Sequence, residues 1–363
     1  MLIRAVNGCA MLDGAVRSSG GGRQDNPVTA GDSVSRAPLG LFVGLSTLDV
    51  VHRVRRVPGA NEKVTARRQD VAAGGPAANA AVVFAALGGD AVLVTALGSD
   101  PLAGCISGEL AVRGVRTIDV TPDHPAPPAI SAVAVTEHSG ERSVVSPDAG
   151  ARSLPTPGKL EQLVDDVLAS GADVMLIDGH HPALALAAAR AARRRGVPVL
   201  VDAGRWKPVM AELLPMADEV VCSADFRWPG TAGPDESAAV LRQLPTAHAG
   251  QRPDNLSTPR LVAVTHGGSP IQWWQGGRFG SIPVPAVAAV DTLGAGDAMH
   301  GAYAFLRTDP VLSVTDRLAG AAAVAALRCS IIGPRDWLAE LASLTLSGQR
   351  SLVDHPPTGQ DQS

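Results

Sequence analysis

The residues best suited to chemistry form one short string, Asp291-Thr292-Leu293-Gly294-Ala295-Gly296-Asp297. Its small residues let the backbone approach a ligand closely, and the helical pattern of residues 294–306 offers free amides with partial positive charge. Such a turn suits a phosphate group. The carboxylate of Asp297, directly after the turn, could accept a proton from an attacking hydroxyl. The same residues also fit a tightly packed turn in which Asp297 is only a favourable charge at a helix start.

The string is not a Walker A loop, because no Gly-Lys-Ser or Gly-Lys-Thr follows its glycines. Taken whole, it resembles the C-terminal signature of the ribokinase-like (PfkB) carbohydrate kinases. The resemblance continues in order along residues 39–332. It implies that Asp297 is the catalytic base and that the turn before it forms an anion hole, made by Leu293, Gly294, Ala295 and Gly296.

Three further segments resemble the substrate-binding parts of this family. They are an opening strand with its terminal acid (residues 44–49), a diglycine followed by a helix (residues 74–79), and a hairpin that carries an arginine (residues 140–142). The substrate-binding residues that the resemblance implies are Asp49, Gly75, Asn79 and Arg142. Three of these residues also have simpler explanations: Asp49 as a strand-end turn residue, Asn79 as a polar residue near a helix start, and Arg142 as a solvated hairpin side chain.

The nucleotide side of the resemblance is less regular. The turn Thr265-His266-Gly267-Gly268 looks like the one that borders the nucleotide, although Pro270 stands where a second glycine is usual. Where the family commonly has Asn-x-x-Glu, this chain has residues 223–226, and Phe226 cannot replace a carboxylate. The implied nucleotide-binding residues are Ser223, Thr265, Gly267 and Thr292. The resemblance also implies a monovalent cation at Asp291 and nearby backbone carbonyls.

Metal and disulfide sites are not indicated elsewhere. The adjacent pair His180-His181 invites a metal-binding interpretation, but neighbouring residues diverge around a helix start and no third ligand is evident. We expect helix capping or solvent exposure for this pair. The four cysteines are isolated from one another, outside any Cys-x-x-Cys pattern, and we expect reduced thiols at Cys9, Cys105, Cys222 and Cys329.

The elements that must position these residues follow from the apolar pattern. Short apolar runs (residues 41–45, 91–97, 174–177, 197–201, 219–222 and 261–264) alternate with helical patterns, as in a parallel sheet covered on both faces. Two regions break that rhythm: residues 50–71 alternate β-branched with charged residues, and residues 130–137 and 141–145 read as a hairpin across residues 138–140. We expect the lid at about residues 50–71 and 116–145, and residues 273–284 read as another hairpin. The predicted fold is therefore α/β, a three-layer ribokinase-like fold with a mostly parallel central sheet and a small antiparallel β lid.

Composition limits the class of protein. The 363 residues are 45% hydrophobic and 18% charged, with a net charge of −4, which predicts a globular chain without a broad basic field for nucleic acid. No apolar run is long enough to span a membrane, and we expect a cytoplasmic protein. Residues 1–38 are predicted to be a disordered arm, residues 39–352 the kinase domain, and residues 353–363 a frayed tail.

If the resemblance holds, the reaction is transfer of the γ-phosphoryl group of ATP to a hydroxyl of a sugar or sugar-like substrate. It implies ATP and Mg²⁺, K⁺ as a further candidate, and a homodimer through the lid. Residues 201–208 look nearer the ketohexokinase and sulfofructose kinase side of the family, which points to a ketose. A nucleoside kinase and a catalytically silent sugar-binding or regulatory protein of the same fold remain alternatives.

Overall fold

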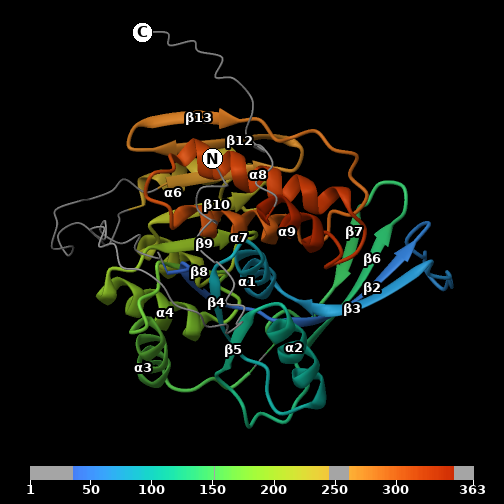
Figure 1. The fold of residues 1–363 in the computed structure, drawn as a ribbon, viewed down its shortest axis with the longest axis horizontal. Helices are drawn as coiled ribbons and strands as arrows, with labels where there is room; N and C mark the ends of the chain where they lie inside the picture. The colour runs from blue at the N-terminus through green and yellow to red at the C-terminus, as the bar shows by residue number, and fades with distance from the viewer. Residues whose placement is uncertain (1–35, 151, 245–260, 347–363) are drawn as a thin grey trace, which may run out of the picture.

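The structure is a computed structural model, and it describes residues 36–150, 152–244 and 261–346. A large sheet with helices on both faces forms the body, and a small sheet projects from it (Figure 1). The predicted arm, apart from its last three residues, and the predicted tail lie outside the described residues. The first strand of the body begins at Leu39.

Within the described residues the large sheet has nine strands, in the order β13-β12-β11-β10-β9-β8-β1-β4-β5. The pairs from β11 to β5 are parallel, and the hairpin of β12 and β13 is antiparallel, as predicted. The strands are β1 (Leu39–Val43), β4 (Asp90–Thr95), β5 (Val115–Asp119), β8 (Val174–Ile177), β9 (Val199–Ala203), β10 (Glu219–Ser223), β11 (Leu261–His266), β12 (Ser269–Gln275) and β13 (Arg278–Ile282).

Helices cover both faces of this sheet because its strands are apolar on both sides. In β1, Phe42 packs into one core while Leu41 and Val43 pack into the other. The core around Phe42 is formed with the helices α1 (Pro76–Ala86), α2 (Pro101–Val112), α7 (Ala295–Arg307), α8 (Val314–Ser330) and α9 (Leu338–Leu346). The other belongs to α3 (Pro157–Leu168), α4 (Pro182–Arg195), α5 (Met210–Leu213) and α6 (Pro234–Gln243).

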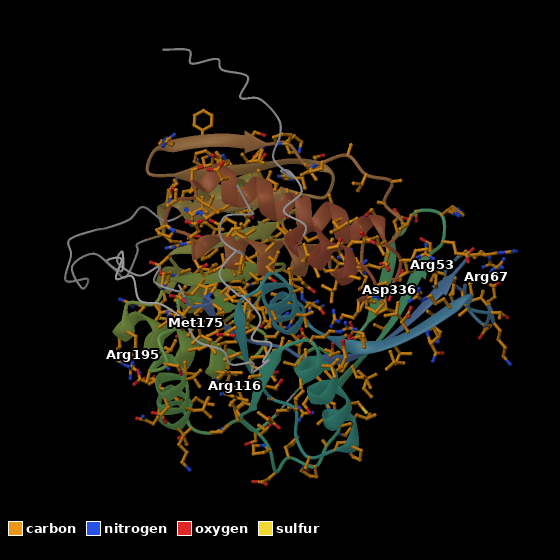
Figure 2. The ribbon with its side chains drawn as sticks, in the orientation of Figure 1. Arg53, Arg67, Arg116, Met175, Arg195 and Asp336 are labelled. Carbon is orange, nitrogen blue, oxygen red and sulfur yellow. The ribbon has the colours of Figure 1, made fainter. Side chains whose placement is uncertain are left out.

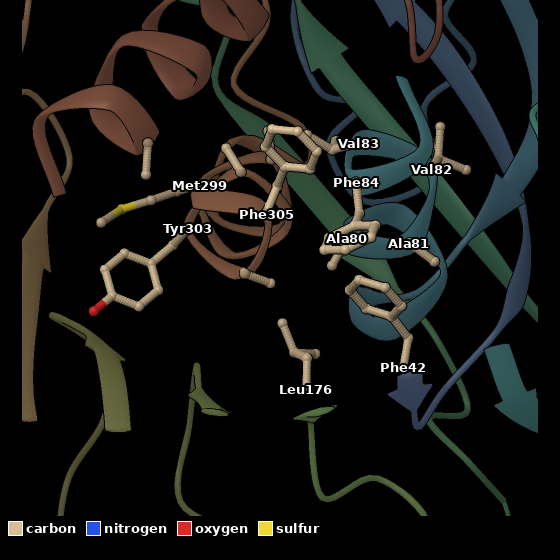
Figure 3. Close-up of a cluster of buried hydrophobic side chains, with 14 of the residues drawn as sticks. Phe42, Ala80, Ala81, Val82, Val83, Phe84, Leu176, Met299, Tyr303 and Phe305 are labelled. Atoms are coloured by element: carbon tan, nitrogen blue, oxygen red, sulfur yellow. The ribbon is translucent and has the colours of Figure 1, made fainter. Parts of the chain in front are cut away.

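Helices α1 and α7, which carry the predicted site residues, are packed directly against each other. Phe84 of α1 meets Phe42 edge-on at 5.3 Å between ring centroids and Phe305 of α7 at 5.5 Å (Figure 3). Gly301 of α7 faces the backbone of Ala80, where a Cβ would collide with the Ala80 carbonyl. This close packing brings the N-terminal ends of the two helices to the same edge of the sheet.

The small sheet has the order β3-β2-β6-β7, with strands β2 (Thr47–Val54), β3 (Arg68–Gly74), β6 (Ala129–Thr136) and β7 (Arg142–Val145). Arg53 and Arg67 lie on this projecting part (Figure 2). The β2–β3 and β6–β7 pairs are antiparallel as predicted, but the central β2–β6 pair is parallel, because a long crossover rather than a hairpin joins these strands.

Residues 116–119, which we expected in the lid, belong instead to the large sheet. They form β5, which pairs in parallel with β4 after the crossover through α2. The lid segment therefore begins at β6 rather than at residue 116.

The two faces of the small sheet differ in chemistry because strand side chains alternate. Asp49 and Ser131, which are paired across β2 and β6, lie on the face toward the body and line its cavity. The other face carries Val71 and Val145, which are 56% and 75% exposed. Over the described part of the chain, no helix combines the length and apolar character needed to cross a membrane.

Candidate active site

A cavity of about 500 Å³ lies between the small sheet and the edge of the large sheet. It is lined by residues at or just after the carboxyl ends of β1, β8, β9, β10 and β11, where open α/β sheets bind their ligands. Most of the predicted site residues line it: Asp49, Gly75, Asn79, Arg142, Ser223, Thr265, Leu293, Gly294, Gly296 and Asp297. The structure thus brings together residues that are up to 248 positions apart, from Asp49 to Asp297.

Asp297 lies in the first turn of α7 with its carboxylate in the cavity. Asn79 donates from Nδ2 to Oδ2 of Asp297 at 2.7 Å, and Arg335 donates to Oδ1 of Asn79 at 3.0 Å. The Asn79 amide is therefore held in one orientation, with its donor toward Asp297. This arrangement fixes the carboxylate, and among the described residues its other oxygen, Oδ1, accepts no hydrogen bond from the protein.

Burial raises the pKa of Asp297, and the negative charge of Asp202 raises it further. The hydrogen bond from Asn79 and the electrostatic effects of His300 and Arg142 lower the pKa of Asp297, but do not cancel the rise. A carboxylate with a raised pKa is a stronger proton acceptor than an ordinary aspartate. Asp297 thus has the electrostatic surroundings expected of a general base.

The turn before Asp297 leaves fewer free amides than the predicted anion hole requires. The amide of Leu293 donates to Oδ1 of Asp291 at 3.1 Å, and that of Ala295 donates to the Thr292 carbonyl at 3.3 Å, so both are engaged. Within the described residues the amides of Gly294 and Gly296 have no protein partner. Gly294 has a φ of 72°, a left-handed conformation that turns the chain into the helix. Two free amides at a helix start remain to bind an anion.

Asp49, near the start of β2, is another carboxylate that lines the cavity. Thr47 donates to it at 2.6 Å, and burial raises its pKa. Gly74 on the neighbouring strand leaves it room, because a Cβ there would collide with the Asp49 carboxylate. Arg335 draws the pKa of Asp49 down, and its own guanidinium is held by Glu109 at 2.8 Å.

Arg335 and Asp178 are positioning residues that the sequence analysis missed. Arg335 joins Asn79, Glu109 and the Ala73 carbonyl from the segment just before α9. Asp178, which is 1% exposed at the end of β8, accepts hydrogen bonds from the amides of Leu45 and Ala77 and so ties β1 to the start of α1. No local pattern marks either residue, because their partners are remote in sequence.

Only some of the predicted nucleotide-binding residues lie at the cavity. Ser223 and Thr265 line the cavity, and Ser223 donates to the Gly204 carbonyl at 2.6 Å. Gly267 lies in the exposed turn between β11 and β12 and does not line the cavity. Phe226 is fully buried against Trp206, which explains why no carboxylate stands there. The exposed Asp225 lines the cavity instead.

Arg142 connects the small sheet to the turn before α7. Its Nη1 lies 3.4 Å from the Thr292 carbonyl, while both the hydroxyl and the amide of Thr292 donate to the Gly140 carbonyl, at 2.9 and 3.0 Å. Gly140 has a φ of 63°, and a Cβ there would collide with the backbone of Val290. Thr292 therefore connects the hairpin turn at Gly140 to the turn before α7, and it does not line the cavity.

The expectation for His180 and His181 was wrong. His181 is 4% exposed and stands at the N-cap of α4 without a side-chain capping bond, and burial lowers its pKa. His180 lines the cavity and contacts Asp148, which also pairs with Arg205. The Asp148 carboxylate, held by both groups, has a pKa well below its usual range. The histidines lie here because β8 ends at this edge of the sheet, which sequence spacing alone does not reveal.

The expected monovalent cation does not fit at Asp291. Arg328 places Nη2 3.2 Å from Oδ1 of Asp291, and each of these residues is 2% exposed. The Gly333 amide donates to the other oxygen, Oδ2, at 3.0 Å. With a guanidinium against the carboxylate, a second cation would be repelled in a site that water cannot screen. We therefore assign no part of the reaction to a metal ion at Asp291.

Comparison with known proteins decides the family. Residues 40–339 match the family described as pfkB family carbohydrate kinase. The chain belongs to this family. As a pfkB family carbohydrate kinase, it is an ATP-dependent sugar kinase. It is 30% identical over 267 residues to an ATP-dependent ribose-1-phosphate kinase from Halopiger xanaduensis, covering 72% of this chain and 82% of that relative. It is 28% identical over 288 residues to a ribokinase of Arabidopsis thaliana, covering 77% and 72%.

Solved structures confirm the predicted ribokinase-like fold. Ribokinase from Thermotoga maritima superposes with a TM-score of 0.60 at 20% identity, over 86% of this chain and all (100%) of that one. An adenosine kinase from Sinorhizobium meliloti gives a TM-score of 0.67 at 21% identity, over 87% of this chain and 100% of that one. Sugar and nucleoside kinases thus share this fold, so the substrate must be argued from the cavity.

Proposed function

We propose that this kinase phosphorylates a hydroxyl of a ribose-like sugar, free or already phosphorylated, with Asp297 as the general base. The observation that carries the proposal is the Asp297 carboxylate at the start of α7, oriented by Asn79 at 2.7 Å and flanked by the free amides of Gly294 and Gly296. The ribokinases and the ribose-1-phosphate kinase among its relatives support a pentose. A ketose, which residues 201–208 suggest, is the second candidate.

In this proposal Asp49 and Asn79 hold the hydroxyls that do not react, and the bound sugar presents its reacting oxygen to Asp297. Asp297 accepts the proton as that oxygen advances on the γ-phosphorus of ATP. The amides of Gly294 and Gly296 stabilise the charge on the phosphate oxygens. Arg142 reaches the same region from the lid, which would cover the sugar and exclude water.

Mg²⁺ would enter with ATP as part of the substrate. No cluster of three or more potential metal ligands exists among residues that the structure describes. That agrees with an ion held mainly by phosphate oxygens and at most one or two carboxylates. Asp225, two residues after Ser223, lines the cavity and is our candidate for such a contact. We propose that Ser223 and Thr265 bind the nucleotide.

A nucleoside is disfavoured by the lining of the cavity. Among the described residues that line it, none is Phe, Tyr or Trp. Stacking of a base usually draws on aromatic side chains, whereas sugar hydroxyls are bound by carboxylates and amides such as Asp49 and Asn79.

The test is an ADP-release assay with ATP and Mg²⁺ against ribose, ribose 1-phosphate, fructose, fructose phosphates and adenosine. The proposal predicts the highest kcat/KM for ribose or ribose 1-phosphate. The highest value for a ketose would support the second candidate. Selective turnover of adenosine would contradict the proposed sugar substrate, and no turnover of any acceptor would favour a silent binding protein.

We also propose that the lid forms a homodimer. A row of apolar residues crosses the outer face of the small sheet through paired positions: Val71, Val50, Ala132 and Val145. Exposed apolar rows of this kind mark interfaces between proteins. Light scattering should give a dimer for the wild type and a monomer for Val145→Lys. The control is Val112→Lys, which changes an 82% exposed valine at the end of α2, outside the small sheet. A monomeric wild type would contradict the proposal.

A further inference from the structure

Arg328 is a buried guanidinium beneath the turn that leads into α7. It lies near the end of α8 and is 2% exposed. Its Nη2 is 3.2 Å from Oδ1 of Asp291, and its Nη1 donates to the carbonyls of Asp291 and Ile331, at 3.4 and 3.1 Å. One carboxylate and two backbone carbonyls therefore converge on a single positive charge.

This oxygen set is also what a monovalent cation would need. The buried Asp291 carboxylate requires a countercharge, because an unpaired buried charge is strongly unfavourable. Arginine supplies one permanently, since its guanidinium does not lose its proton in proteins. Among the described residues, the carboxylate also accepts hydrogen bonds from the backbone amides of Leu293 at 3.1 Å and Gly333 at 3.0 Å.

We propose that Arg328 is a built-in replacement for the monovalent cation that the family resemblance places at Asp291, so that this kinase works without K⁺. The inference rests on the proposed kinase function. It makes Arg328 a positioning residue for the anion hole, not a catalytic residue. Through Asp291, Arg328 fixes the Leu293 amide, and the chain then turns at Gly294 to present its two free amides.

The first experiment compares wild-type protein in KCl, NaCl and tetramethylammonium chloride at equal ionic strength, by melting temperature and by kcat. The expected result is the same melting temperature in all three salts, within about 1 °C, because no site distinguishes them. Turnover should agree within about twofold. A rise in melting temperature or turnover specific to K⁺ would overturn the inference.

The second experiment removes the guanidinium with Arg328→Met, which keeps a long apolar side chain. Turnover should fall by about 10- to 100-fold in tetramethylammonium, because the anion hole loses its support. KCl should then raise both the melting temperature and the turnover. The matched control is Arg317→Met on the same helix, whose guanidinium pairs with Glu219 at 3.3 Å and does not contact the turn. It should lose stability and gain no response to K⁺.

A folded Arg328→Met variant without a K⁺ response would overturn the assignment of Arg328 to the cation position. If that variant does not fold, Arg328→Lys, which keeps the charge, and the wild-type comparison still decide the question. The melting temperatures can be measured even if the protein has no turnover. A protein that phosphorylates none of the acceptors would therefore contradict the proposed function, while the melting temperatures would still test the assignment of Arg328.

Discussion

Replacement of Asp297 by Asn tests the proposed mechanism most directly. The change keeps the size of the side chain, and its amide oxygen can still accept the 2.7 Å hydrogen bond from Asn79. It removes the proton acceptor. We expect turnover to fall by about 10²- to 10⁴-fold, the usual contribution of a general base, or about 2.7–5.5 kcal/mol in the barrier.

This magnitude distinguishes Asp297 as a general base from Asp297 as only a favourable charge at a helix start. Such a charge contributes about 0.3–1 kcal/mol, less than about sixfold in rate. A loss of two orders of magnitude or more is therefore beyond what the helix start explains. Retention of most of the wild-type turnover would refute the base assignment and leave the turn as a phosphate cradle.

The thermal stability of Asp297→Asn tests the raised pKa of Asp297 independently of turnover. The raised pKa of Asp297 means that its charged form is disfavoured in the folded protein, so the wild type loses stability as the pH rises through that pKa. Asp297→Asn should therefore melt at a higher temperature than the wild type at pH 7. This advantage should disappear below about pH 4, where the carboxyl group is protonated in the folded and the unfolded chain.

The assay is ADP release on the acceptor found by the substrate screen, with ATP binding measured by calorimetry. ATP binding should survive in Asp297→Asn or strengthen, because a negative charge beside the phosphates is gone. Asp297→Glu is the control, because it keeps a carboxylate at a displaced position. Its pH profile should retain an acidic limb, whereas the residual rate of the Asn variant should lack one.

Three further changes have distinct expected results. Asp49→Ala should raise the KM for the sugar with much less effect on ATP affinity, and an unchanged sugar KM in steady-state kinetics would remove Asp49 from the site. Arg335→Met should lower the free energy of unfolding by about 3 kcal/mol, measured by denaturant titration. It should also raise the sugar KM, because Asn79 loses its orienting donor, and an unchanged KM in steady-state kinetics would contradict the positioning role of Arg335. Asp202→Asn should move the acidic limb of kcat/KM to lower pH, because the charge of Asp202 raises the pKa of Asp297, and a limb that stays in place or moves to higher pH would contradict this coupling.

Much of the fold could be predicted from the sequence because its signals are local. Pro76 and Pro101 each begin a helix, Asp100 caps α2 through the Leu102 amide at 2.9 Å, and short apolar runs mark the buried strands. These features depend on neighbours within a few residues. Where the signal was ambiguous the prediction failed, as for β5, because β-branched alternation fits an edge strand of either sheet.

Residues that line the cavity could be predicted where they stand in recognisable strings, such as Gly74-Gly75 and the turn before Asp297. The residues that hold these side chains in position do not belong to such sequence motifs. Arg335 reaches Asn79 across 256 positions, and Arg328 reaches Asp291 across 37. A hydrogen bond between remote residues leaves no spacing in the sequence, so only the tertiary structure reveals it.

The sequence by itself determined the residue types available for chemistry: a carboxylate directly after a turn of small residues, and further carboxylate and amide groups suited to sugar hydroxyls. The tertiary structure decided which of them are free to act. It engages the amides of Leu293 and Ala295 within the turn, and it fills the expected cation position with Arg328. The reason is physical: whether an amide or a carboxylate can bind a ligand depends on whether the fold has already satisfied it.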